Sequence, residues 1–262
     1  MTNQFKDRSK IYLTLGIVAL VSSFIFIFLA YAVDSSGFLH RHLLGFDDFF
    51  NNYFSTHQFS LGVDILMLLA TYLVSPAVMI GALVVLFLIL VIVHRRYLSA
   101  FFLAGLAIGG ILDFVFKMIF ERARPVAAFY SVSQPGYSFP SAHALIATVF
   151  YGFLGFCFAH AFRKRWQKVT VSVLAGLIVF LVGVSRVFLG VHFASDVIGG
   201  WAVGLVLLAL LIFIFYHAHD HIHAPPFAFP HGPTMIFISV ILLLLGALVW
   251  HFFSISPLVL VQ

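Results

Sequence analysis

Charged residues are scarce in this sequence. They make up 9% of the 262 positions, whereas a soluble domain carries about 25%. Apolar residues make up 63%, and they are grouped in successive runs of about 20 residues, the length of a membrane-spanning helix. This composition excludes an ordinary soluble domain and favours an all-α polytopic membrane protein. The net charge of +5 does not indicate nucleic-acid binding, because the basic residues cluster in short turns between apolar runs.

Cysteine is almost absent, since Cys157 is the only one and lies inside an apolar run. A single cysteine excludes an internal disulfide and a metal site built from thiolates. The sequence also lacks an internal repeat and a separate soluble segment. We therefore expect one transmembrane domain over residues 1–262, with its motif core at 98–216, and we predict neither a cofactor nor a bound metal.

Seven apolar runs predict a core bundle of six transmembrane helices and an additional seventh at the C-terminus. The predicted ranges are Ile11–Val33, Pro76–Val93, Leu98–Phe120, Ser141–Phe162, Val169–Leu189, Ala194–Tyr216 and, for the additional span, Met235–Phe253. Ala30-Tyr31-Ala32 resembles a signal-peptidase site. The run before it exceeds the roughly 7–15 apolar residues of a signal peptide, so we expect the first span to be retained.

Two segments before the second span allow alternatives. Residues 34–60 mix aromatic and polar side chains, which suits either a helix in the membrane interface or a loop packed on the bundle. Residues 61–73 are apolar but end at Ser75-Pro76, a good N-cap followed by a good first helical residue. We expect a short separate helix there, and the alternative is one long span kinked at Pro76.

Lysine and arginine predict the orientation. Nine of the fourteen lie in the N-terminal segment, at 95–96 and at 163–168, which six alternating spans place on one side. Cytoplasmic loops are enriched in Lys and Arg, so we expect a cell-membrane protein with a cytoplasmic N-terminus. Four of the other five basic residues, Lys117, Arg122, Arg124 and Arg186, then lie near the extracytoplasmic ends of spans. An even number of spans would leave this arrangement unchanged.

Ionisable residues at those span ends form three segments. In the first, Lys117 and Arg124 are seven residues apart, about two helical turns, so both can point the same way. Asp113 is one turn before Lys117 and would lower the cost of burying the ammonium group. The alternative is that Lys117 only extends to the interface. Arg122 is a weaker candidate for an outer contact.

In the second segment, Pro140 and Ser141 open a predicted helix, and the N–H groups of a first helical turn bind anions. His143 follows, placed where a general acid would stand beside such an anion. In the third segment, Arg186 precedes His192 and Asp196. If the chain is helical from His192 onward, Asp196 lies one turn later on the same face and can orient the imidazole. Cations, a helix N-terminus and two histidines together predict a phosphate site.

These residues resemble the three signature motifs of the type 2 phosphatidic acid phosphatase superfamily. The matching residues are Lys117-x6-Arg124-Pro125, Pro140-Ser141-Ala142-His143 and Ser185-Arg186-x5-His192-x3-Asp196. The resemblance implies that His192 attacks phosphorus, Asp196 orients it and His143 protonates the leaving oxygen. It implies that the phosphoryl group is bound by Lys117, Arg124, Arg186, Ser141 and the N–H of Ala142. Ala142 replaces the glycine usual in the second motif, so we expect retained but altered activity.

The expected substrate is a lipid phosphate whose tails stay in the bilayer: undecaprenyl diphosphate, phosphatidylglycerophosphate or phosphatidic acid. The alternatives are a phosphotransferase with a lipid or sugar acceptor and a non-catalytic binder or transporter of lipid phosphates. Separately, the histidines between His217 and His223 suit a transition metal on the cytoplasmic side, and a solvated linker is the alternative. The motifs do not predict an oligomeric state.

Overall fold

The computed structural model describes residues 2–92, 97–125 and 135–221. Its regular structure within these ranges is entirely helical, as the composition predicts. The helices are α1 (Thr2–Asp34), α2 (Phe38–Thr56), α3 (Leu61–Tyr72), α4 (Pro76–Ile92), α5 (Tyr97–Phe120), α6 (Ala142–Ala161), α7 (Arg165–Phe188) and α8 (Ala194–His221). The predicted seventh span and His223 of the histidine cluster lie outside these ranges, whereas His217, His219 and His221 belong to the C-terminal end of α8.

Five of these helices are long and apolar enough to cross a membrane, or six if α3 and α4 are counted as one bent span. The predicted spans begin and end within a few residues of the observed helices, except that α1 starts earlier and α8 extends further. The chain breaks at Ser75-Pro76 as expected, and α3 is bent by 59° from α4. The expected short separate helix is therefore present as α3, and the sharp bend at Pro76 separates it from α4.

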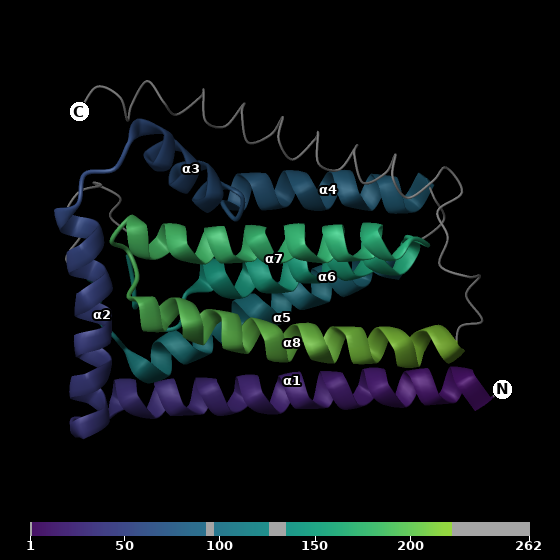
Figure 1. Ribbon diagram of the computed structural model, residues 1–262, viewed down its shortest axis with the longest axis horizontal. Coiled ribbons are helices and arrows are strands. Elements are labelled where there is room, and N and C mark those ends of the chain that lie inside the picture. Colours follow the sequence, from purple (N-terminus) through teal and green to yellow (C-terminus); the bar gives the residue numbers. More distant parts are fainter. Residues whose placement is uncertain (1, 93–96, 126–134, 222–262) are drawn as a thin grey trace.

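The long helices α1, α4, α5, α6, α7 and α8 run along the bundle, and α2 lies across one of its ends (Figure 1). The aromatic segment at 34–60 is thus largely a helix and not a loop. Leu43 and Asp47 are buried on its inner side, whereas Phe46 and Phe49 are exposed. α2 is thus a helix packed on the bundle through one side, and its location in the membrane interface stays a prediction.

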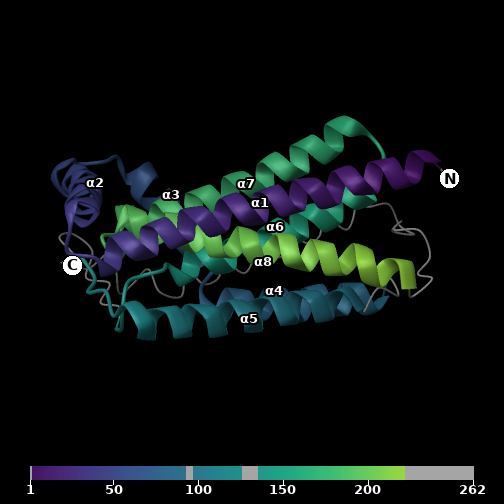
Figure 2. The ribbon, with the colours of Figure 1, turned by 90° about the horizontal axis from the view of Figure 1, so that it is seen from below.

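The ends of the helices fall into two groups. The N-terminus, the end of α4, the start of α5 and the α6–α7 junction lie at one end of the bundle, and the α7–α8 junction lies at the other, beside α2 (Figure 1). Figure 2 shows α4 and α5 together along one side of the bundle. The basic α6–α7 junction therefore lies at one end, and all three motif segments are brought to the opposite end.

Close packing of α6 against its neighbours fixes the position of the motif segments along the bundle axis. Most side chains of α6 are buried, with Phe150 and Phe153 at its centre. A Cβ at Gly200 of α8 would lie 2.5 Å from the backbone oxygen of Ser141. Only glycine fits this approach. The start of α6 is thereby held directly against the first turns of α8.

Candidate active site

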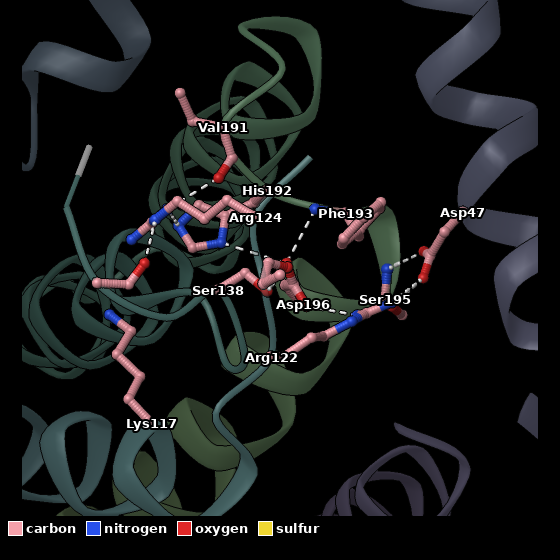
Figure 3. Close-up of polar contacts among 12 residues, drawn as sticks. Asp47, Lys117, Arg122, Arg124, Ser138, Val191, His192, Phe193, Ser195 and Asp196 are labelled. Atoms are coloured by element: carbon pink, nitrogen blue, oxygen red, sulfur yellow. Dashed lines mark hydrogen bonds and ion pairs between the residues drawn. The ribbon is translucent and has the colours of Figure 1, made fainter. Parts of the chain in front are cut away.

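The three motif segments meet beneath α2 at one end of the bundle (Figure 3). Backbone hydrogen bonds join them: the N–H of Ser138 donates to Arg122 at 2.8 Å, and the N–H of Ser141 donates to Asp196 at 2.9 Å. The segments are distant in sequence, so the fold and not local structure creates the site.

His192 lies in the short connection between α7 and α8. The helix begins at Ala194, as the predicted span does, so His192 lies just before it, and the pairing of His192 with Asp196 does not need a helical His192. Nδ1 of His192 lies 3.4 Å from Oδ2 of Asp196, which also accepts the N–H of Phe193 at 2.9 Å. A carboxylate here favours the tautomer with its proton on Nδ1 and leaves the lone pair on Nε2.

Arg124 faces that second nitrogen. Its Nη1 is 3.1 Å from Nε2 of His192 and 2.8 Å from the carbonyl oxygen of Val191, and its Nε donates to Gly136 at 3.0 Å. Because a guanidinium only donates, Nε2 must be the acceptor. Burial lowers the pKa of His192 to about 4, against the hydrogen bond and charge of Asp196, which raise it. The imidazole is therefore neutral at pH 7 and has a free lone pair for nucleophilic attack.

Arg186, in the last turn of α7, is almost completely buried. Its Nη1 donates to the hydroxyl of Thr71 on α3, while its Nε and Nη2 are buried without a hydrogen-bond partner. An unpaired buried guanidinium is costly, so the arrangement calls for an anion beside Arg186. Thr71 was missed in the sequence, because a threonine in an apolar run gives no signal of which distant side chain it will meet.

Lys117 and Asp113 form the pair expected from their spacing on α5, with Nζ and Oδ2 2.8 Å apart. Both side chains are partly buried, and Lys117 lies on the same side of the site as Arg124 (Figure 3). The carboxylate offsets part of the cost of holding an ammonium group in the bundle. Lys117 is thus anchored inside the bundle by an ion pair and does not simply extend to the interface.

The start of α6 supplies the remaining predicted groups. Ser141 is the N-cap, yet its hydroxyl is buried without a hydrogen-bond partner and makes no capping bond. Ala142 is the first helical residue, so its N–H and that of His143 have no acceptor within the helix. The cations that act on His143 are Arg186, Lys117 and Arg124. This is a helix N-terminus with a free hydroxyl, facing three cations.

Arg122 faces away from these cations. Its Nη1 lies 2.6 Å from Oδ1 of Asp196, and its Nη2 lies 2.7 Å from Oδ2 of Asp47 on α2. The expected outer contact is therefore to the carboxylate behind His192. Asp47 was not predicted, because it is one of two adjacent aspartates and the sequence does not show which of them faces inward.

Several helices long and apolar enough to cross a membrane are typical of a polytopic membrane protein, and this one gathers histidine and cationic side chains at one end of its bundle. Residues 98–220 match the model of the PAP2 superfamily. The superfamily resemblance of the three motifs is thus confirmed.

Three relatives illustrate the similarity. Phosphatidylglycerophosphatase B of Bacillus subtilis is 41% identical over 102 residues, which cover 38% of this chain and 50% of that protein. Dolichyldiphosphatase 1 of Homo sapiens is 32% identical over 158 residues, 56% of this chain and 63% of that protein. The crystal structure of a transmembrane PAP2 type phosphatidylglycerolphosphate phosphatase from Bacillus subtilis matches with a TM-score of 0.68 and 26% identity, covering 76% of this chain and 96% of that one. The alignments with the first two span about half to two thirds of the relatives' lengths.

Proposed function

We propose that this protein is a membrane lipid phosphate phosphatase that works through a phosphohistidine. The observation that carries the proposal is His192, held by Asp196 on one nitrogen and facing Arg124 with the other. Arg186 stands beside it with two unpaired N–H groups. The named functions of the relatives, phosphatidylglycerophosphatase, dolichyldiphosphatase and lipid A 4'-phosphatase, support a phosphate or diphosphate attached to a membrane lipid.

In the first step of the proposed reaction, Nε2 of His192 attacks phosphorus and a P–N bond forms as the P–O bond to the lipid breaks. His143 gives its proton to the departing oxygen. Asp196 accepts the Nδ1–H of His192 throughout and stabilises the positive charge on the phosphorylated ring. Arg124, which faces Nε2 at 3.1 Å, must turn its N–H groups to the phosphoryl oxygens for the attack to occur.

In the second step, water attacks the phosphohistidine while His143 takes the proton from the water. The P–N bond breaks, inorganic phosphate leaves and His192 is again neutral. Lys117, Arg124 and Arg186 neutralise the phosphoryl oxygens, with the Ser141 hydroxyl and the Ala142 N–H as further donors. These five groups supply the charge stabilisation that a divalent cation provides in other phosphatases, so we propose a reaction without a metal.

The proposed location is the cell membrane, with the basic end of the bundle in the cytoplasm and the site outside. Cysteines at exposed Asn52 of α2 and exposed Lys164 near α7 would report the two ends, since the native Cys157 is buried. We expect an impermeant thiol reagent to label Asn52→Cys, and not Lys164→Cys, in intact cells. Labelling of Lys164→Cys alone would reverse the proposed orientation.

Phosphate release from purified protein in detergent tests the activity. The substrates are undecaprenyl diphosphate, phosphatidylglycerophosphate and phosphatidic acid, assayed with EDTA. We expect release from at least one of them, its abolition by His192→Ala and its persistence in His57→Ala, an exposed histidine of the same end of the bundle. Activity in His192→Ala contradicts the mechanism, and inhibition by EDTA contradicts the metal-free reaction.

The same assay separates the alternatives. A phosphotransferase would release little phosphate and label an added lipid or sugar acceptor. A non-catalytic binder would release none from any substrate while still retaining the lipid.

A further inference from the structure

A carboxylate outside the matched family region is buried behind the site. Asp47 lies on the inner side of α2, with 1% of its surface exposed. Its Oδ1 accepts the N–H of Ser195 at 2.9 Å, and its Oδ2 accepts the Ser195 hydroxyl at 2.6 Å. The first-turn N–H groups of a helix have no acceptor within it, so Asp47 satisfies a free donor at the start of α8.

Arg122 links this carboxylate to the one that faces His192. One guanidinium contacts Oδ2 of Asp47 at 2.7 Å, Oδ1 of Asp196 at 2.6 Å and the Ser195 hydroxyl at 2.7 Å. Its central carbon also lies 4.3 Å from the centre of the Phe193 ring. Arg122 is therefore held on three sides, and within the described part of the chain its side chain is the only one that hydrogen-bonds to Oδ1 of Asp196.

These contacts fix the plane of the Asp196 carboxylate. Oδ1 is held by Arg122, and Oδ2 is held by the N–H of Phe193 on the side toward His192. Asp47 fixes the guanidinium and the neighbouring backbone at once (Figure 3). Neither Asp47 nor Arg122 is among the groups that face the cations of the phosphate pocket, so any effect on chemistry must pass through Asp196.

We propose that Asp47, through Arg122 and Ser195, is a positioning residue that sets the orientation of Asp196 and thereby of the His192 nucleophile. This inference rests on the proposed phosphatase function and extends it to α2. A residue that only anchored α2 would need no charge, since an apolar contact would hold the helix without the cost of burying two carboxylates. Here both carboxylates share one guanidinium, which couples their geometry.

Asp47→Asn is the test, because the amide keeps the shape and loses the charge. Its NH₂ group would meet the donors of Ser195 and Arg122, and Arg122 would be drawn toward Asp196 alone. We expect kcat for lipid-phosphate hydrolysis to fall about tenfold or more, as for other residues that orient a reacting ligand, with KM within about twofold. Asp48→Asn is the matched control: it removes the adjacent, exposed carboxylate of the same helix and should keep full activity.

A double-mutant cycle with Arg122→Gln gives a second readout. If both residues act on Asp196, the double variant should be much less impaired than the product of the two single effects predicts. Independent, multiplicative losses would overturn the coupling. If Asp47→Asn does not fold, as judged by its elution and melting in detergent, Ser195→Ala takes its place with the same expected loss of kcat.

The outcomes separate this inference from the proposed function. If the wild type releases no phosphate from any substrate, the proposed function fails. If the wild type is active, His192→Ala is inactive and folded Asp47→Asn keeps the wild-type kcat, the function stands and the positioning role is wrong. A raised KM with unchanged kcat would also overturn it, since that result assigns Asp47 to substrate binding.

Discussion

The two parts of the chain contribute different things to the site. The region from α5 to α8 supplies every group that faces the proposed phosphate. The region from α1 to α4 lies outside the family match, but it supplies Thr71, which holds Arg186, and Asp47, which holds Arg122. The reacting groups and their supports thus come from different parts of the sequence. The region matched by the family therefore contains the groups that face the proposed phosphate, but not the residues of α2 and α3 that hold Arg122 and Arg186 in place.

Packing differs in the same way. Glycines of the second region, such as Gly200 and Gly183, contact other helices so closely that a Cβ would overlap them, whereas Gly16, Gly45 and Gly81 of the first region have open space. Few of the described apolar side chains of α1 are buried, whereas most of those of α6 are. The second region is a tightly packed unit, and the first lies around it and supports it at two polar points.

The largest predicted effect belongs to the second region. Arg186→Met should lower kcat/KM for lipid-phosphate hydrolysis about 10²–10³-fold, because it removes a buried donor of phosphoryl charge stabilisation. Arg165→Met, an exposed arginine at the other end of the bundle, is the control and should keep wild-type kinetics. An active Arg186→Met would place the main cationic support elsewhere, and the division between the two regions would have to be redrawn.

The next effect is on stability. Gly200→Ala places a Cβ 2.5 Å from the backbone oxygen of Ser141 and 3.3 Å from the nitrogen of Leu145, and neither backbone atom can move freely. We expect a loss of about 1–3 kcal/mol in the free energy of unfolding, seen as a lower melting temperature in detergent.

Gly81→Ala on α4 is the matched substitution in the first region, where nothing lies within 4 Å of the added carbon. It should leave the melting temperature unchanged or slightly raise it, since alanine is the better helix former. If Gly200→Ala and Gly81→Ala lowered the melting temperature equally, the two regions would not differ in packing as the structure indicates.

The pH dependence of stability gives a test in which the two regions act in opposite directions. Burial lowers the pKa of His192 to about 4 and raises the pKa of Asp47. An unfolded chain protonates His192 near its ordinary pKa of about 6.5, so this residue reduces stability as the pH falls from about 6.5 toward 4. Folded Asp47 takes up a proton at a higher pH than the unfolded chain, so its contribution increases as the pH falls.

The wild type should therefore lose about 1–2 kcal/mol of stability from His192 between pH 7 and 5, offset in part by Asp47. Melting temperatures across this range should fall less for His192→Gln and more for Asp47→Asn. His57→Gln, at an exposed position, should follow the wild type. The opposite order of the two variants would contradict the directions of both pKa shifts.

Much of the fold could be predicted from the sequence because apolar length and turn chemistry are local signals. The spans, the break at Ser75-Pro76 and the Asp113–Lys117 pair all follow from such signals. The meeting of Lys117, His143 and His192 at one end follows from alternating spans. Local signals do not predict the 59° angle between α3 and α4, or that Asp47 and not Asp48 is buried, because both depend on tertiary packing. For the same reason the sequence does not show that Thr71 and Asp47 contact the arginines of the site.

The smallest predicted effect tests the other support of the first region. Thr71→Val keeps the shape of the side chain and removes the oxygen that accepts from Nη1 of Arg186, which would leave a third buried donor of that guanidinium unpaired. Bound phosphate can still engage the other two donors, so we expect kcat/KM to fall only about five- to tenfold, near 1 kcal/mol. Thr148→Val is the control, because its buried hydroxyl donates only to Ala144 within α6. The hydrogen bond to Thr71 helps to orient the guanidinium of Arg186. If Thr71→Val lowered kcat/KM as much as Arg186→Met, α3 and not α7 would determine the position of this guanidinium.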